Sequence, residues 1–143
     1  MRESARWAEE LPQRWEAEGR PYERRLVDET IAWVRELAPS QPELVLAHQD
    51  LHGGNVLRAE REPWLVIDPK PFLGDPAYDA TQHLFNCDER LQSNPLPTIE
   101  RFARLAGIDA ERVRLWIFAR AAAEPRDEWR DVELDLARRL APR

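Results

Sequence analysis

Residues 48–55 read His48-Gln49-Asp50-Leu51-His52-Gly53-Gly54-Asn55, a run that places carboxylate, imidazole and amide side chains in close succession. Its two adjacent glycines disfavour a stable helix and permit unusual backbone angles, which is typical of a tight functional loop. The apolar run Leu44-Val45-Leu46-Ala47 comes just before it and predicts a short buried strand. We therefore expect a strand that leads the chain into a polar loop.

Two short strand-like runs follow this loop, at residues 56–59 and 64–67. A connection that contains Pro63 joins them, so the pattern predicts a β-hairpin. The polar loop is therefore expected to lie directly beside the first strand of the hairpin.

The symmetry of this hairpin predicts a metal site at its open end. Asn55 and Asp68 are equally distant along the chain from the expected centre of the turn, between Arg61 and Glu62, so we expect them side by side. Paired strands lie about 4.8 Å apart and Mg²⁺ binds oxygen ligands at about 2.1 Å, so an amide oxygen and a carboxylate there can share one ion. Asp50 is then left to face a substrate.

Helical patterns surround the loop and the hairpin. Asp75 and Pro76 have the residue types of an N-cap and a first helical turn, and residues 115–119 are apolar on nearly every side, which predicts the most buried helix. The fold class we expect is α+β, mostly α-helical, in a single domain over residues 1–143. The predicted helices are 3–17, 22–37, 76–85, 98–106, one that follows Asp109, and 127–141.

Composition narrows the possible partners. The net charge of −6 is spread as mixed charges, which argues against nucleic acid and suits a cationic small molecule. The single cysteine, Cys87, cannot form an internal disulfide, and we see neither a secretory signal nor an apolar run long enough for a membrane span. A cytoplasmic protein without membrane contacts is expected.

Three motifs stand in order along the chain. His48, Asp50 and Asn55 match the register H-x-D-x-x-x-x-N, the catalytic loop of protein kinases and their relatives. Ile67-Asp68 then follows the predicted hairpin, and Gly74-Asp75-Pro76-Ala77-Tyr78-Asp79 comes a few residues later. Together these motifs resemble the aminoglycoside phosphotransferase family.

Two further segments are similar to the streptomycin and hydroxyurea kinases within that family: Ile-Asp-Pro-Lys-Pro at 67–71, and residues 79–87. The resemblance covers the chain after about Trp7. It implies the C-terminal lobe of a protein-kinase-like fold. It also implies an ATP-dependent phosphotransferase lobe that acts on a hydroxyl group of a small molecule and confers antibiotic resistance in the full-length parent.

The resemblance assigns roles in catalysis to three residues. Asp50 becomes the catalytic base toward a substrate hydroxyl, and Asn55 and Asp68 become ligands of Mg²⁺ or Mn²⁺. ATP is the implied phosphoryl donor, and Lys70 is a candidate contact to this nucleotide.

Supporting roles fall to three further residues. The resemblance makes Asp79 the aspartate that braces the catalytic loop, although it can also serve as first-turn helix charge. His48 is expected to hold the geometry of the loop, and His52 either supports the loop or contacts a ligand.

Other interpretations of the loop stay open. Asp50 by itself can be a turn residue whose carboxylate accepts hydrogen bonds from local amides. His48, Asp50 and His52 can instead be three ligands of a metal hydrolase, which would need a further ligand, and His83 is the only other histidine.

The nucleotide-binding half of a kinase is not recognisable in this sequence. The only glycine pair is Gly53-Gly54 and the only lysine is Lys70, so neither a glycine-rich phosphate loop nor an N-terminal strand lysine can be assigned. We expect an absent N-terminal lobe or a partner chain to complete the site. Self-association is also expected, through apolar surface near Leu44, Val45, Leu46 and the hairpin. The alternative function is a non-catalytic binding domain.

Overall fold

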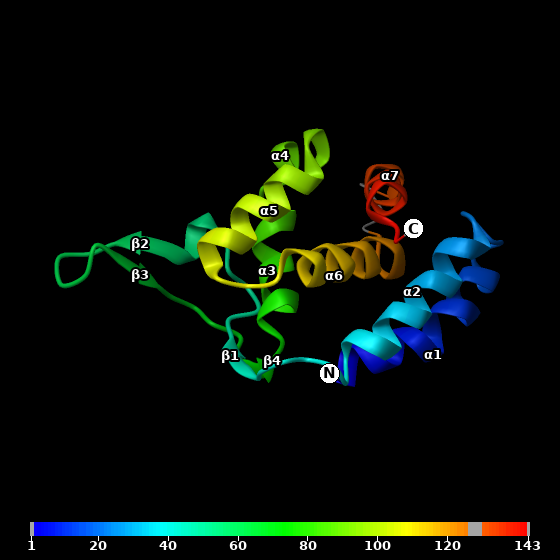
Figure 1. Cartoon of the computed structure of the whole chain (residues 1–143), viewed down its shortest axis with the longest axis horizontal. Coiled ribbons are helices and arrows are strands. Elements are labelled where there is room, and N and C mark those ends of the chain that lie inside the picture. The colour runs from blue at the N-terminus through cyan, green and yellow to red at the C-terminus, as the bar shows by residue number, and fades with distance from the viewer. Residues whose placement is uncertain (1, 126–129, 143) are drawn as a thin grey trace.

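The computed structural model describes residues 2–125 and 130–142, and most of them are helical. Two small antiparallel strand pairs accompany the helices, which agrees with the expected α+β class. Figure 1 shows the β2–β3 hairpin projecting from one end and the α1–α2 pair at the other. The helices are α1 (Arg2–Ala17), α2 (Arg24–Leu37), α3 (Pro76–Phe85), α4 (Asp88–Ser93), α5 (Pro95–Ala106), α6 (Ala110–Ala123) and α7 (Arg130–Leu140). The strands are β1 (Val45–Ala47), β2 (Val56–Arg58), β3 (Trp64–Val66) and β4 (Phe72–Gly74), and Gly53–Asn55 form a short 3₁₀ helix, η1.

Helix α6 is the centre of the helical body. It packs against α2, α3, α5 and α7. Because it has neighbours on all sides, an apolar residue is favourable on every face, and Ile117, Phe118 and Ala119 are fully buried. The prediction that residues 115–119 form the most buried helical stretch is confirmed.

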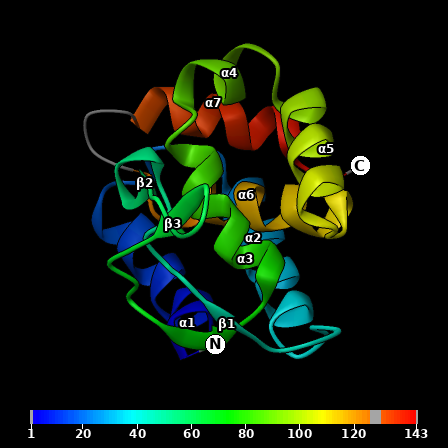
Figure 2. The same ribbon diagram turned by 90° about the vertical axis from the view of Figure 1, so that its left-hand side faces the viewer.

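Helix α3 connects this body to the loop. Asp75 precedes it and accepts a hydrogen bond from the backbone N–H of Ala77, which confirms the predicted N-cap. The second oxygen of Asp75 accepts hydrogen bonds from Arg112 Nε at 2.7 Å and Trp116 Nε1 at 2.8 Å, both on α6. Seen from the hairpin side, α3 runs between α4 and the β1–β4 pair (Figure 2).

Two short elements differ from the expectation of a single hairpin. Strand β4 pairs with β1, with Leu46 opposite Leu73, and α4 forms between α3 and α5. These elements have three and six residues, too short for a periodic pattern to reveal. Helix α5 also begins earlier than predicted, because Pro95 occupies its first turn. Of the predicted helix 127–141, residues 127–129 lie outside the described residues.

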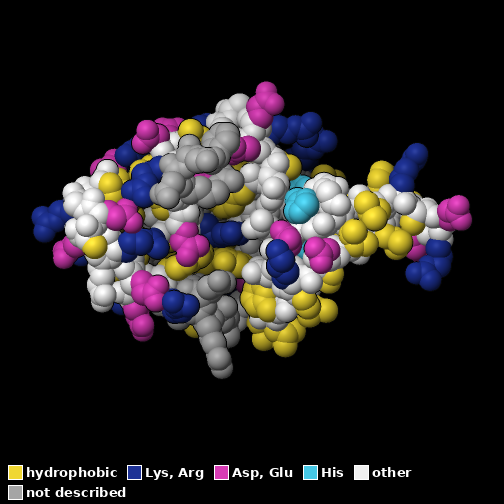
Figure 3. Space-filling view, turned by 180° about the vertical axis from the view of Figure 1, so that it is seen from behind, with side chains coloured by type: hydrophobic (Ala, Val, Ile, Leu, Met, Phe, Trp, Pro, Cys, Tyr) yellow, Lys and Arg dark blue, Asp and Glu magenta, His cyan; other side chains and the backbone are white. Residues whose placement is uncertain are grey.

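Apolar side chains remain exposed at the hairpin end. Leu46 is 74% exposed and Leu73, its partner across the strands, is 64% exposed. Hydrophobic side chains gather over the β1–β4 edge and along the projecting hairpin (Figure 3). The exposure expected near Leu44 and Leu46 is confirmed. The expectation of a buried strand is wrong, because within β1 only Ala47 is buried and Val45 is half-buried.

Candidate active site

Asp79, in the first turn of α3, holds the start of the polar loop. Its two carboxylate oxygens accept hydrogen bonds from the backbone N–H groups of His48, at 2.9 Å, and Gln49, at 2.7 Å. Because Asp79 lies on a helix that packs against α6, the loop is fixed to the helical body. A carboxylate that accepts two backbone N–H groups makes strong, charge-assisted contacts.

His48 ties the loop to the segment that follows the hairpin. Its Nδ1 accepts the N–H of Asp50 at 3.2 Å, so its Nε2 carries the proton and donates to the carbonyl oxygen of Ile67 at 3.0 Å. The carbonyl oxygen of His48 accepts the N–H of Lys70 at 3.0 Å. Both nitrogens of the imidazole therefore hold the loop in place through contacts to the backbone.

The unusual backbone angles do not fall on the glycines. Gln49 has φ 65° and Asp68 has φ 54°, while Gly53 and Gly54 stay outside the left-handed region. The expectation for the glycines is wrong because the turns that redirect the chain lie one residue before Asp50 and at Asp68. Gly54 has a different use: a Cβ there would lie 2.9 Å from the Cε1 atom of His52.

His52 belongs to the loop's own support. Its Nδ1 accepts the N–H of Gly54 at 3.1 Å and thereby caps η1. Its Nε2 lies 4.0 Å from a carboxylate oxygen of Asp50. The ring is therefore positioned both to order the turn and to face the proposed base.

Asn55 is buried and its amide is oriented by the loop. Its Nδ2 donates to the backbone carbonyl oxygen of Asp50 at 2.8 Å. The opposite side of the amide, Oδ1, has no hydrogen-bond partner among the described residues and is available as a ligand atom. An amide oxygen beside a carboxylate is the donor chemistry that Mg²⁺ prefers.

The hairpin register differs by one residue from the symmetric expectation. Val56 pairs with Val66, and the N–H of Ile67 donates to the carbonyl oxygen of Asn55. Asn55 therefore lies opposite Ile67, and Asp68 falls one residue beyond. The cause is the loop between β2 and β3, which has an odd number of residues and so is centred on Arg61.

Asp50 forms an ion pair with Lys70, whose Nζ lies 2.9 Å from Asp50 Oδ2. The hydrogen bond from Lys70 lowers the pKa of Asp50, and the positive charge of Lys70 lowers it further. The same hydrogen bond raises the pKa of Lys70, and Asp68 adds to this increase. Lys70 is thus an ammonium group close to both aspartates, a position that its place in the sequence did not reveal.

The sequence pattern of the aminoglycoside/hydroxyurea antibiotic resistance kinase family matches residues 4–129. The chain belongs to this family.

Curated relatives support the assignment over the same region. The hydroxyurea phosphotransferase of Kitasatospora aureofaciens is 39% identical over 117 residues, which cover 82% of this chain and 34% of that protein. The streptomycin 6-kinase of Streptomyces glaucescens is 37% identical over 118 residues, 78% of this chain and 38% of that protein. The chain therefore spans about a third of the length of these relatives. No solved structure matches it.

The metal-hydrolase interpretation does not agree with the loop. Both ring nitrogens of His48 are occupied by backbone contacts, so this side chain is not oriented as a ligand. In the part of the chain that the structure describes, no three His, Cys, Asp or Glu residues are grouped to hold a metal ion. Within residues 2–125 and 130–142, no helix is both long and apolar enough to cross a bilayer.

Proposed function

We propose that this chain is the C-terminal lobe of a protein-kinase-like enzyme that transfers the γ-phosphoryl group of ATP to a hydroxyl group of a small molecule. Streptomycin and hydroxyurea are the candidate acceptors, after the names of the relatives. The observation that carries the proposal is the fixed loop, in which Asp79 and His48 hold Asp50 next to the amide of Asn55.

Asp50 is the proposed base. A carboxyl group with the ordinary aspartate pKa of 3.8 is ionised at neutral pH, so Asp50 can accept the proton of the acceptor hydroxyl. As the proton moves to Asp50, the hydroxyl oxygen forms a bond to the γ-phosphorus, the bond from that phosphorus to the bridging oxygen breaks, and ADP leaves.

We propose that Lys70 leaves Asp50 when the substrates bind. Its ammonium group contacts Oδ2 of Asp50 and so competes with the acceptor hydroxyl for this carboxylate. The Lys70 side chain is 70% exposed, so little packing opposes this movement. We propose that Lys70 then contacts a phosphate group of the nucleotide.

Asn55 and Asp68 are the proposed metal ligands. The free Oδ1 of Asn55 supports this role, and the carboxylate of Asp68 is solvent-exposed. When bound, Mg²⁺ or Mn²⁺ would neutralise charge on the phosphate groups. In the observed hairpin register Asp68 is not the strand partner of Asn55, so the turn at Asp68 would have to direct its carboxylate toward the same ion.

A complete site requires a second body. The relatives are about three times as long as the region that this chain matches. Apolar side chains are also exposed on the β1–β4 edge and on the hairpin. We propose that a nucleotide-binding lobe, or a partner chain that supplies one, covers this surface. Self-association through the same surface is expected when that lobe is absent.

A chimera tests the proposed function. In it, this chain replaces the matching third of the hydroxyurea phosphotransferase of K. aureofaciens, and transfer from labelled ATP to hydroxyurea and to streptomycin is measured. Asp50→Asn should reduce the rate by about 10²-fold or more, since general-base catalysis contributes about 10²–10⁴-fold. Asp109→Asn is the matched control, because Asp109 caps α6 away from the loop and asparagine caps equally well.

The chain alone should turn over ATP negligibly. Correct alignment of reactants supplies about 7–11 kcal/mol of a barrier, and a single lobe leaves the γ-phosphate mobile. An active chimera whose rate is unchanged by Asp50→Asn would instead favour the alternative, a binding domain without a catalytic role.

A further inference from the structure

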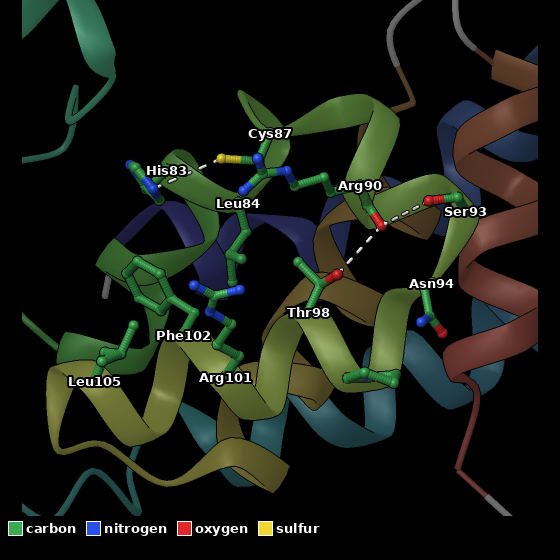
Figure 4. Close-up of a pocket in the computed structure, with 11 residues that line it drawn as sticks. His83, Leu84, Cys87, Arg90, Ser93, Asn94, Thr98, Arg101, Phe102 and Leu105 are labelled. Atoms are coloured by element: carbon green, nitrogen blue, oxygen red, sulfur yellow. Dashed lines mark hydrogen bonds between the residues drawn. The ribbon is translucent and has the colours of Figure 1, made fainter.

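A hollow of about 580 Å³ lies between the end of α3, α4 and α5, apart from the polar loop (Figure 4). This volume falls within the range of small-molecule sites, about 300–1,000 Å³. None of its lining residues takes part in the loop around Asp50.

One wall of the hollow is flat and apolar. Phe102 stacks on His83 with ring centroids 5.1 Å apart and planes 27° from parallel. Burial lowers the pKa of His83, so this stacked ring is uncharged at neutral pH. Leu105 lies beside Phe102 on the same wall and is 76% exposed, so a bound ring would remove both side chains from water (Figure 4).

The other walls carry positive charge. Arg90 comes from α4 and Arg101 from α5, and both guanidinium groups extend over the hollow (Figure 4). Over the described residues, no carboxylate forms an ion pair with either of them, whereas Arg112 and Arg138 are each bound by an acidic side chain. The residues that line the hollow include both arginines and no aspartate or glutamate, so positive charge is in excess over the lining.

We propose that this hollow binds a small organic anion with a flat ring, either a carboxylate or a phosphate monoester. The oxyanion lies between Arg90 and Arg101, because planar guanidinium groups bind carboxylate and phosphate oxygens in pairs. The ring lies on Phe102 and Leu105. The site is separate from the proposed phosphoryl transfer, and the same two arginines repel a cationic acceptor.

Cys87 provides a reporter of occupancy. It is the one cysteine of the chain and lines the hollow, with its Sγ 3.6 Å from Nε2 of His83. Alkylation of the purified 143-residue chain by neutral iodoacetamide therefore modifies a single thiol. Phenyl phosphate or benzoate should slow this reaction, and benzamide, which has a similar shape without charge, should not.

Arginine variants test the charge recognition. Arg90→Gln and Arg101→Gln should each raise the half-protecting concentration of the acids about tenfold, the effect expected from losing one charge-assisted contact. Arg104→Gln is the matched control, because Arg104 is an exposed arginine of α5 that does not line the hollow. Comparing phenyl phosphate with benzoate identifies which oxyanion the site prefers.

An equilibrium measurement removes any dependence on thiol reactivity. The same acids should raise the thermal unfolding midpoint of the wild-type chain and of Arg104→Gln, and should lose this effect in the variant that combines Arg90→Gln with Arg101→Gln. Equal protection by benzamide would overturn the proposal. So would a full effect of the acids in the double variant, or the absence of both protection and a midpoint shift in the wild type. None of these readouts requires ATP or catalysis.

Discussion

Phe118 in α6 is fully buried, whereas Leu46 in β1 leaves 74% of its surface in solvent. The helical body is held together by apolar side chains that face one another, and the polar loop by a few hydrogen bonds between distant segments. Asp79 reaches His48 and Gln49 across about thirty residues of sequence, and His48 reaches Ile67. Global stability and order in the site should therefore respond to different substitutions.

The largest contrast should come from the same substitution in the two regions. Leu136 is fully buried in α7, so Leu136→Ala should lower the free energy of unfolding by about 2–5 kcal/mol. In dilute solution, where the chain is monomeric and Leu46 is exposed, Leu46→Ala should change it by less than about 0.5 kcal/mol. Urea unfolding of both variants measures the difference. A similar loss at Leu46 would mean that the β1–β4 edge is covered in solution.

Asp75 ties the start of α3 to α6 and should rank next. Asp75→Ala leaves the guanidinium of Arg112 and the indole N–H of Trp116 without their acceptor in a largely buried place. We expect a loss of about 3 kcal/mol, because breaking a buried ion pair leaves an uncompensated charge. Asp75→Asn keeps one acceptor oxygen and should lose less in the same unfolding measurement. Equal losses would show that the negative charge, rather than the acceptor, carries the contact.

Asp79 should affect the loop more than the body. Asp79→Ala removes the acceptor of two backbone N–H groups, at a cost of about 1–3 kcal/mol to the ordered loop. Hydrogen exchange of the His48 and Gln49 amides should accelerate about tenfold or more. Asp109→Ala removes a comparable carboxylate contact to a backbone N–H, that of Arg112, outside the loop. If Asp109→Ala accelerates exchange of the His48 and Gln49 amides as much as Asp79→Ala does, Asp79 has no special role in ordering the loop.

The smallest effect should depend on pH. A hydrogen bond from Arg138 lowers the pKa of Glu23 to about 2 from an ordinary value of 4.5. The stabilisation is therefore present above pH 4.5 and is lost as the pH falls toward 2. Both side chains are about half exposed, so the stabilisation from this ion pair should not exceed about 1 kcal/mol. The difference in unfolding free energy between wild type and Glu23→Gln should shrink over this range, and a constant difference would contradict the assignment.

The helices and the hairpin could be predicted because their signals are local. The apolar run of α6, the cap at Asp75 and the two short strand-like runs of β2 and β3 follow from neighbouring residues. The hairpin register could not be fixed in the same way, because one residue more or less in the turn gives an equally plausible pattern. The roles of Asp50, Asn55, Asp68 and Lys70 in catalysis, and of ATP and Mg²⁺, stay predictions.

The sequence by itself determined the order of the motifs, the membership of the family and the helices that bury the core, since each depends on residue type and spacing along the chain. Tertiary structure decided that β4 pairs with β1, that the strained backbone angles fall on Gln49 and Asp68, and that Lys70 contacts Asp50. It also brought Arg90 and Arg101 to one hollow. These contacts join segments that are distant along the chain and give no periodic signal in the sequence, so only the folded chain brings them together.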